Sequence, residues 1–126
     1  MNQCRILVVD DEPLLAEITA ELLEGESYAT SFCTSAKEAL AMGASKEFDF
    51  IISDLSMPDM GGIEMIRQWI QTHDFVPKVI FITGHTEVII PKIEGVEVLA
   101  CLTKPVDERD ILRLISTQSA TKPAKR

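Results

Sequence analysis

The sequence lacks any long hydrophobic run. No apolar stretch approaches the roughly 18 residues that are needed to cross a bilayer. The first residues do not resemble a signal peptide, because the acidic residues Asp10, Asp11 and Glu12 follow only a short apolar run. We therefore expect a cytoplasmic protein without a membrane partner.

Basic residues, cysteines and histidines are also few. The chain has 12 lysines and arginines against 20 aspartates and glutamates, and its net charge of −8 argues against nucleic-acid binding, because affinity for phosphate backbones comes from Lys and Arg. Cys4, Cys33 and Cys101 are odd in number and have no CxxC spacing, so we expect buried, reduced thiols. His73 and His85 are far apart in the sequence and lack the spacing of a metal-binding pair.

What is present is the pattern of a single α/β domain. A length of 126 residues, with 46% hydrophobic and 25% charged residues, suits one soluble globular domain with one core. Short apolar runs alternate with helical patterns, which predicts βαβ units, a parallel sheet and right-handed crossovers. The expected strands span residues 4–10, 28–33, 48–53, 79–83 and 96–102.

Four connections have the pattern of a helix. These helices are expected from Pro13 to near Gly25, after the N-cap Ser35, from Gly62 to about Thr72, and from Asp107 onward. The first is predicted to be amphipathic, with Leu14, Leu15, Ile18 and Leu22 on its apolar side. The second has a mostly small face that includes Gly43, and Trp69 of the third is interpreted as a packing residue.

The connection between Thr83 and Val96, GHTEVIIPKIEG, is a poor helix. Its β-branched run is followed directly by Pro91, and both features disfavour a regular helix. We expect this fourth helix to be short, irregular or missing.

Polar residues stand where the expected strands end. At its C-terminal end the first strand delivers Asp10 and Asp11, the third Asp54, the fourth Thr83 and the fifth Lys104. In an open parallel sheet this edge is where ligands bind, so these side chains are predicted to converge at one rim.

Such a rim has the groups for phosphoryl transfer. Carboxylates about 4 Å apart repel by roughly 4 kcal/mol per pair at an effective dielectric of about 20, so the cluster calls for a cation. Mg²⁺ is commonly held by one or two carboxylates together with phosphate oxygens and waters. An Asp nucleophile beside a metal, a Lys and a hydroxyl can accept a phosphoryl group as an aspartyl phosphate.

The motifs VVDDEP, SDLSMPDMGG, ITGH and TKP resemble those of the response regulator receiver domain of two-component signalling systems, the CheY-like family. The resemblance covers residues 4–117 and leaves 118–126 as a flexible tail or the start of a linker. It implies a flavodoxin-like (βα)5 doubly wound sheet with the strand order 2-1-3-4-5.

The resemblance also implies a Mg²⁺ site. Asp54 matches the phosphoacceptor, Asp11 a direct metal ligand, Asp10 a ligand that acts largely through water, and Ser56 a ligand through its backbone carbonyl. Glu12, next in the chain, is expected to be solvated and not a ligand.

Further positions match the residues around the phosphoryl group. Thr83 would hydrogen-bond to it, Lys104 would pair with it, and Gly84 would leave space for the donor. In the family the positions of Ser56 and His85 influence how long the phosphoryl group survives.

The function implied is that of a phosphoacceptor in a phosphorelay. A sensor histidine kinase or histidine phosphotransfer protein would donate the phosphoryl group, and an unidentified output partner or downstream domain would respond. The chain would not be an enzyme apart from its own phosphotransfer and autodephosphorylation. Cys101 stands where the family has Tyr or Phe, and together with the poor fourth helix it predicts an atypical output face.

Other interpretations fit less well. A haloacid-dehalogenase-type phosphatase needs a second Asp two residues after the nucleophile, where the chain has Ser56. A flavodoxin needs a hydroxyl-rich phosphate loop, where this chain is acidic, and an EF-hand loop that begins at Asp54 would need Glu at Met65. The alternative that stays open is a receiver-shaped interaction module that signals without phosphorylation.

Overall fold

The structure is a computed structural model that describes residues 4–84 and 90–120. In these residues, five parallel strands form one sheet in the order β2-β1-β3-β4-β5, which confirms the predicted fold class and strand order. The strands are β1 (Arg5–Val9), β2 (Ala29–Cys33), β3 (Phe50–Asp54), β4 (Lys78–Thr83) and β5 (Val98–Thr103). No helix within the described ranges is long and apolar enough to cross a membrane.

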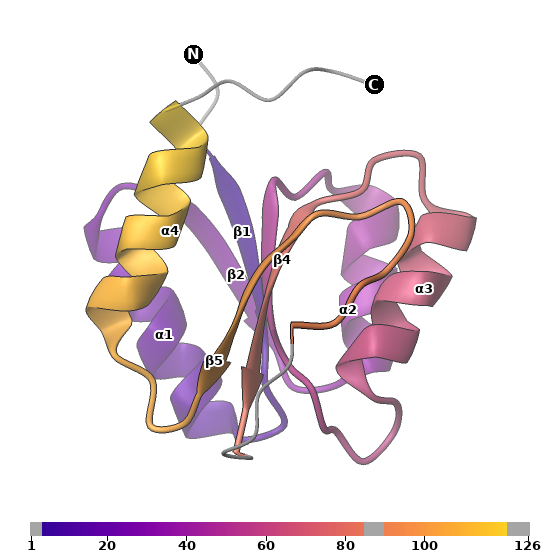
Figure 1. The fold of residues 1–126 in the computed structure, drawn as a ribbon, viewed down its shortest axis with the longest axis horizontal. Coiled ribbons are helices and arrows are strands. Elements are labelled where there is room, and N and C mark those ends of the chain that lie inside the picture. Colours follow the sequence, from indigo (N-terminus) through magenta and orange to yellow (C-terminus); the bar gives the residue numbers. More distant parts are fainter. Residues whose placement is uncertain (1–3, 85–89, 121–126) are drawn as a thin grey trace.

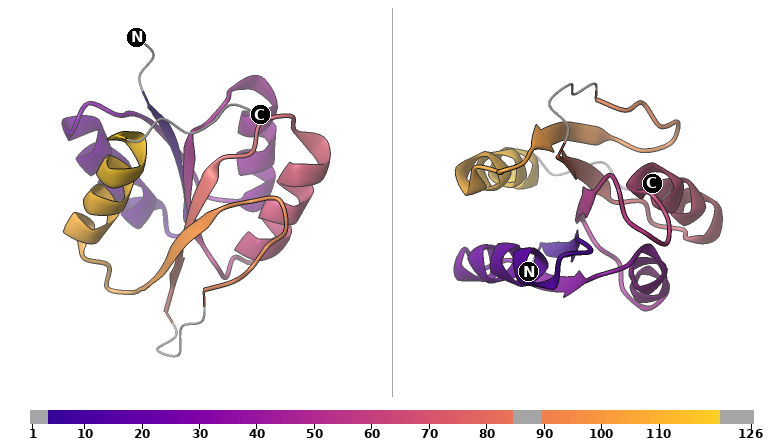
Figure 2. Two further views of the ribbon diagram at one scale, coloured as in Figure 1. Left: turned by 45° about the horizontal axis from the view of Figure 1, so that its top comes forward. Right: turned by 90° about the horizontal axis from the view of Figure 1, so that it is seen from below.

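Helices cover both faces of the sheet. They are α1 (Pro13–Gly25), α2 (Ala36–Ser45), α3 (Gly62–Thr72) and α4 (Glu108–Ala120). Figure 1 and the view from below in Figure 2 show α1 and α4 on one face of the sheet, and α2 and α3 on the other. The last helix therefore continues past residue 117, where the sequence placed the end of the domain.

The poor fourth helix is confirmed for the residues described. Residues 90–97 contain no helix, and His85 and residues 86–89 lie outside the described part of the chain. The 90–97 segment instead lies on the α3 side of the sheet, where Ile93 is buried and Gly95 approaches Ile70 of α3. Gly95 has a φ of 90°, which favours glycine.

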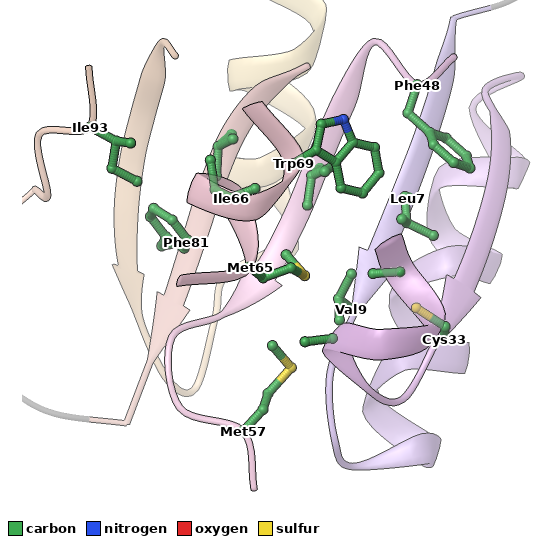
Figure 3. Packing of buried hydrophobic residues seen from close by; sticks show 14 residues of the cluster. Leu7, Val9, Cys33, Phe48, Met57, Met65, Ile66, Trp69, Phe81 and Ile93 are labelled. Carbon is green, nitrogen blue, oxygen red and sulfur yellow. The ribbon is translucent and has the colours of Figure 1, made fainter. Parts of the chain in front are cut away.

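The sheet divides the apolar residues into two cores. Successive side chains of a strand point to opposite faces. In β1, Leu7 and Val9 therefore pack under α2 and α3, as Figure 3 shows, whereas Ile6 and Val8 pack under α1 and α4. Every residue of β3 is buried, so the strand that leads to Asp54 is held from both sides.

The apolar side of α1 is not where the sequence pattern placed it. The residues of α1 that face the sheet are Ala16, Ala20 and Leu23. Leu14, Leu15 and Ile18 are exposed, at 67%, 39% and 43%. Small side chains let the helix approach the sheet closely, and the larger ones then point to solvent. We call Leu14, Leu15 and Ile18 the α1 apolar face.

The predicted N-cap of α2 is confirmed, because the Ser35 Oγ accepts a hydrogen bond from the Glu38 N–H at 3.1 Å.

Helices α2 and α3 pack so closely that a side chain on Gly43 of α2 would meet Trp69 of α3. The Trp69 ring is 1% exposed and lies edge-on to Phe48, with ring centroids 6.5 Å apart, so it is a packing residue as predicted. Gly43 leaves room for this ring.

The three cysteines are free thiols, but only Cys33 is buried, whereas Cys4 and Cys101 are half-buried. Burial raises the pKa of Cys33 to about 11 and that of Cys4 to about 12. The prediction of buried reduced thiols is thus correct for Cys33 and overstated for the other two.

Gly43→Ala should destabilise the protein. A Cβ at this position would collide with the Trp69 ring. Overpacking costs up to about 3 kcal/mol, and a collision with a buried ring belongs to the upper part of that range, so the cost exceeds the gain of about 1 kcal/mol from replacing Gly by Ala in a helix. Urea denaturation should show a lower midpoint. Gly25→Ala, at the end of α1, is the control, since nothing lies within 4 Å of its added Cβ, and it should keep or raise the stability. Equal stability of both variants would contradict this packing.

Candidate functional site

Asp54 is delivered to the carboxyl edge of the sheet by a buried strand. It is the last residue of β3 and is 5% exposed. The Leu55 N–H donates to the Ile82 carbonyl at 2.8 Å, so pairing with β4 continues one residue past Asp54. Gly62, the first residue of α3, lies so close that a Cβ there would collide with the Asp54 carbonyl oxygen. The close approach of α3 to the end of β3 therefore requires this glycine.

Three carboxylates gather at this edge, as the sequence predicted. Asp10, Asp11 and Asp54 each offer a carboxylate oxygen, and these oxygens all lie within 4.8 Å of one another. Asp10 and Asp54 are buried, and Asp11 is more exposed than either. Hard oxygen ligands at this spacing, with one side open to solvent, fit a Mg²⁺ ion that keeps several waters.

Lys104 places an ammonium among these carboxylates. Its Nζ lies 3.0 Å from Asp54 Oδ2 and 3.8 Å from Asp10 Oδ2. Partial burial acts to lower the pKa of Lys104, but its hydrogen bonds and the neighbouring carboxylates outweigh this and raise it above the usual value. The backbone N–H of Lys104 donates to the Thr83 carbonyl at 2.8 Å, which fixes where the side chain begins. The Lys104–Pro105 peptide is cis.

The buried Asp10 has few compensating contacts. Burial raises the pKa of the Asp10 carboxyl above its usual value, although two contacts act in the opposite direction. These are the Glu12 N–H, which donates to Asp10 Oδ1 at 3.0 Å, and the charge of Lys104. The charges of Asp54 and Glu12 also raise the pKa of Asp10, so burial and the neighbouring carboxylates together outweigh the two favourable contacts.

The remaining predicted residues lie around this cluster. Thr83 ends β4 and is 3% exposed; in the register of the sheet it follows Ile82, the partner of Asp54. The Ser56 N–H donates to Asp54 Oδ1 at 3.4 Å, which is a long hydrogen bond. An added Cβ on Gly84 would meet no described atom within 4 Å.

Glu12 makes a contact that the sequence did not predict. Its side chain is 60% exposed, as expected for a solvated residue, yet its Oε1 accepts a hydrogen bond from Lys104 Nζ at 3.1 Å. The two residues are 92 positions apart, so only the assembled sheet brings them together.

Asp59 was also missed. It lies in the loop after β3, and its carboxylate accepts hydrogen bonds from the backbone N–H groups of Lys37 at 3.1 Å and Ala36 at 3.4 Å. Slight burial acts to raise the pKa of Asp59, but these N–H groups outweigh it and hold the pKa below its usual value. The loop that follows the site is thereby tied to the start of α2. The sequence could not predict this contact with α2, because Asp is common in turns and a single Asp in a loop does not indicate a distant partner.

The geometry combines a buried nucleophile with positive charge. One oxygen of Asp54 faces the ammonium of Lys104, and the neighbouring carboxylates can hold a hard divalent cation. Groups placed in this way stabilise the negative charge of a transferring phosphoryl group.

Comparisons with known proteins agree with this geometry. The sequence profile of the response regulator receiver domain matches residues 6–116. The response regulator ArlR of Staphylococcus saprophyticus is 31% identical over 123 residues, which cover 96% of this chain and 54% of that protein. The two-component response regulator ARR11 of Arabidopsis thaliana is 32% identical over 111 residues, which cover 85% of this chain and 21% of that protein.

A solved structure shares the fold. The CheY-like response regulator receiver domain protein from Methanospirillum hungatei is 28% identical, with a TM-score of 0.78 and coverage of 93% of this chain and 94% of that one. In the curated relatives compared, the matched region spans between 19% and 54% of the protein. The profile match extends over most of this chain and includes every residue of the acidic cluster. The chain belongs to the response regulator receiver domain family.

Proposed function

We propose that this receiver domain accepts a phosphoryl group on Asp54 from a sensor histidine kinase or a histidine phosphotransfer protein. The observation that carries the proposal is the position of the Asp54 carboxylate, 3.0 Å from Lys104 and within the cluster that Asp10 and Asp11 complete. A buried carboxylate in such a place has both a nucleophilic oxygen and compensation for the charge that the reaction develops.

In the proposed step, an Asp54 carboxylate oxygen attacks the phosphorus of a phosphohistidine. The new O–P bond forms as the P–N bond breaks, and the histidine ring leaves with the electron pair and takes up a proton. Lys104 pairs with the phosphoryl oxygens, and the Thr83 hydroxyl donates to one of them. Autodephosphorylation is the attack of water on the same phosphorus, which releases phosphate and restores the carboxylate.

The acidic residues would hold Mg²⁺ during this step. Asp11, Asp54 and the Ser56 carbonyl are the proposed direct ligands, and Asp10 would act through a water. When bound, the cation neutralises charge on the phosphoryl oxygens and on the carboxylates. Any catalysis is confined to the domain's own phosphoryl group, and we propose a cytoplasmic location.

The proposal predicts that acetyl phosphate with Mg²⁺ adds the mass of one phosphoryl group, as measured by intact mass spectrometry. Asp54→Asn should abolish this gain, because the amide is not a nucleophile here, and chelation of Mg²⁺ should suppress it. Asp59→Asn is the matched control, five residues further along in the loop after β3, and should still gain the mass. No gain by the unmodified protein would instead favour an interaction module that signals without phosphorylation.

A protein donor would need a surface beside the site, and the α1 apolar face provides one. It lies on the first turns of α1, directly after Asp10 and Asp11, and its three side chains are exposed. Apolar side chains exposed next to a reactive centre are typical of a protein contact surface. We propose that the phosphodonor docks there.

Ile18→Glu should therefore slow phosphotransfer from a protein donor at least about tenfold, which corresponds to about 1.4 kcal/mol. The rate with acetyl phosphate should not change, because a small donor needs no docking surface. The measurement uses autophosphorylated histidine kinases that label the unmodified chain. Ile90→Glu, a similarly exposed isoleucine away from α1, is the control. Equal loss with acetyl phosphate would point to a damaged site rather than a docking surface.

The output face is proposed to be atypical. The described residues between β4 and β5 have no helix, and Cys101, half-buried on β5, is too small to report a change at Thr83 as an aromatic ring would. A switch from 1:99 to 99:1 needs about 5.5 kcal/mol of differential stabilisation. Phosphorylation adds about −1.5 to −2 charges, and this large local change in charge can supply much of that stabilisation.

NMR spectra of the free protein and of its Mg²⁺–beryllofluoride complex should test this. We expect shifts along β4, β5 and the 90–97 segment, with non-helical secondary shifts for residues 90–97 in both states. A regular helix over those residues that carries the largest shifts would contradict the proposal. The proposed limits of the receiver are residues 4–117. Residues 118–126, which begin with the last residues of α4, are then a tail or the start of a linker to an unidentified output partner.

A further inference from the structure

Glu12 uses its side chain in an unusual way for its position. It is the N-cap residue of α1, yet its carboxylate makes no capping hydrogen bond to the helix. It reaches instead across the carboxyl edge of the sheet to Lys104, with Oε1 at 3.1 Å from Nζ. The Glu12 carboxylate therefore pairs with Lys104, which follows β5, and does not cap the backbone N–H groups of α1.

Lys104 does not need Glu12 to stay in place. Its backbone N–H is bonded to the Thr83 carbonyl, and its Nζ lies 3.0 Å from Asp54 Oδ2. An ammonium has three N–H donors, and in the unphosphorylated protein Glu12 and Asp54 each accept one of them. Glu12 therefore takes up a donor rather than supplying the support.

We propose that Glu12 is a positioning residue that occupies Lys104 in the unphosphorylated protein and thereby slows phosphorylation. The inference rests on the proposed function of Asp54. Glu12 and an incoming phosphoryl group compete for Lys104, because the N–H donor that Glu12 accepts is not available to a phosphoryl oxygen.

The charge of Glu12 acts in the same direction. Its side chain is 60% exposed, whereas those of Asp54 and Asp10 are 6% and 9% exposed, so Glu12 lies at the entrance to the site. A negatively charged donor meets this carboxylate before it reaches the buried acceptor. Because the repulsion acts through solvent, it should weaken with added salt.

The first measurement tests the contact without any phosphorylation. An amine-reactive acylating reagent is applied to the Mg²⁺-free protein, and peptide mass spectrometry follows modification of Lys104 relative to the exposed Lys46. An amine held by a carboxylate reacts more slowly than a free one. Glu12→Gln should raise the relative rate at Lys104 about fivefold, which corresponds to about 1 kcal/mol, the upper range for an exposed ion pair.

The second measurement tests the consequence. With saturating Mg²⁺ at low salt, Glu12→Gln should be phosphorylated by acetyl phosphate about fivefold faster than the unmodified protein, by the same conversion. The advantage should shrink at high salt, and it should be smaller with phosphoramidate, a less negative donor. Glu24→Gln, at the other end of α1, removes the same charge without touching Lys104 and should match the unmodified protein in both measurements.

The outcomes separate the inference from the proposed function. Unchanged Lys104 labelling in Glu12→Gln would overturn the inference, whether or not Asp54 is phosphorylated. Faster labelling with a phosphorylation rate no higher than that of Glu24→Gln would overturn the slowing effect. If the unmodified protein takes up no phosphoryl group at all, the proposed function fails, and the labelling result alone then decides whether Glu12 holds Lys104.

Discussion

The site depends on one ion pair, between the carboxylate of Asp54 and the ammonium of Lys104. Asp54 ends β3 and Lys104 follows β5. The two meet because β3, β5 and the intervening β4 are parallel and end at one edge. Backbone hydrogen bonds continue the pairing beyond the strands on both sides of β4, at Leu55 and at Lys104. The buried apolar residues on both faces of the sheet hold β3 in place, and this fixes the position of Asp54 at its end. Since an unpaired buried carboxylate is costly, the pair and the sheet register support each other.

The surroundings of this pair are electrostatically unfavourable for the metal-free protein. The carboxylates of Asp10, Glu12 and Asp54 lie within 3.8 Å of one ammonium, Asp11 lies beside two of them, and burial already raises the pKa of Asp10. A site built only for stability would have fewer acids. Unfavourable clusters of like charge are expected at sites that bind a cation or carry out a reaction. Membership of the receiver family is consistent with an acidic cluster at this one edge, while the interior on both sides of the sheet is apolar.

Much of this arrangement could be predicted from the sequence, because strand periodicity and the residues that follow each strand are local signals. The resemblance in the motifs then supplied the strand order. What failed depended on partners elsewhere in the chain. Helical periodicity located the apolar stripe of α1, but it could not show that Ala16 and Ala20 would face the sheet and leave Ile18 exposed. The contacts of Glu12 with Lys104 and of Asp59 with α2 join residues distant in the sequence, for which no spacing rule exists.

The environment of the thiols has a practical consequence for chemistry on this protein. With pKa values of about 11 for Cys33 and about 12 for Cys4, both thiols are almost entirely protonated at neutral pH. The ionised form is the one that reacts with oxidants and alkylating agents. An engineered surface cysteine would therefore outcompete Cys4 and Cys33 for a maleimide dye, so a fluorescent probe can be attached without first removing those two native residues.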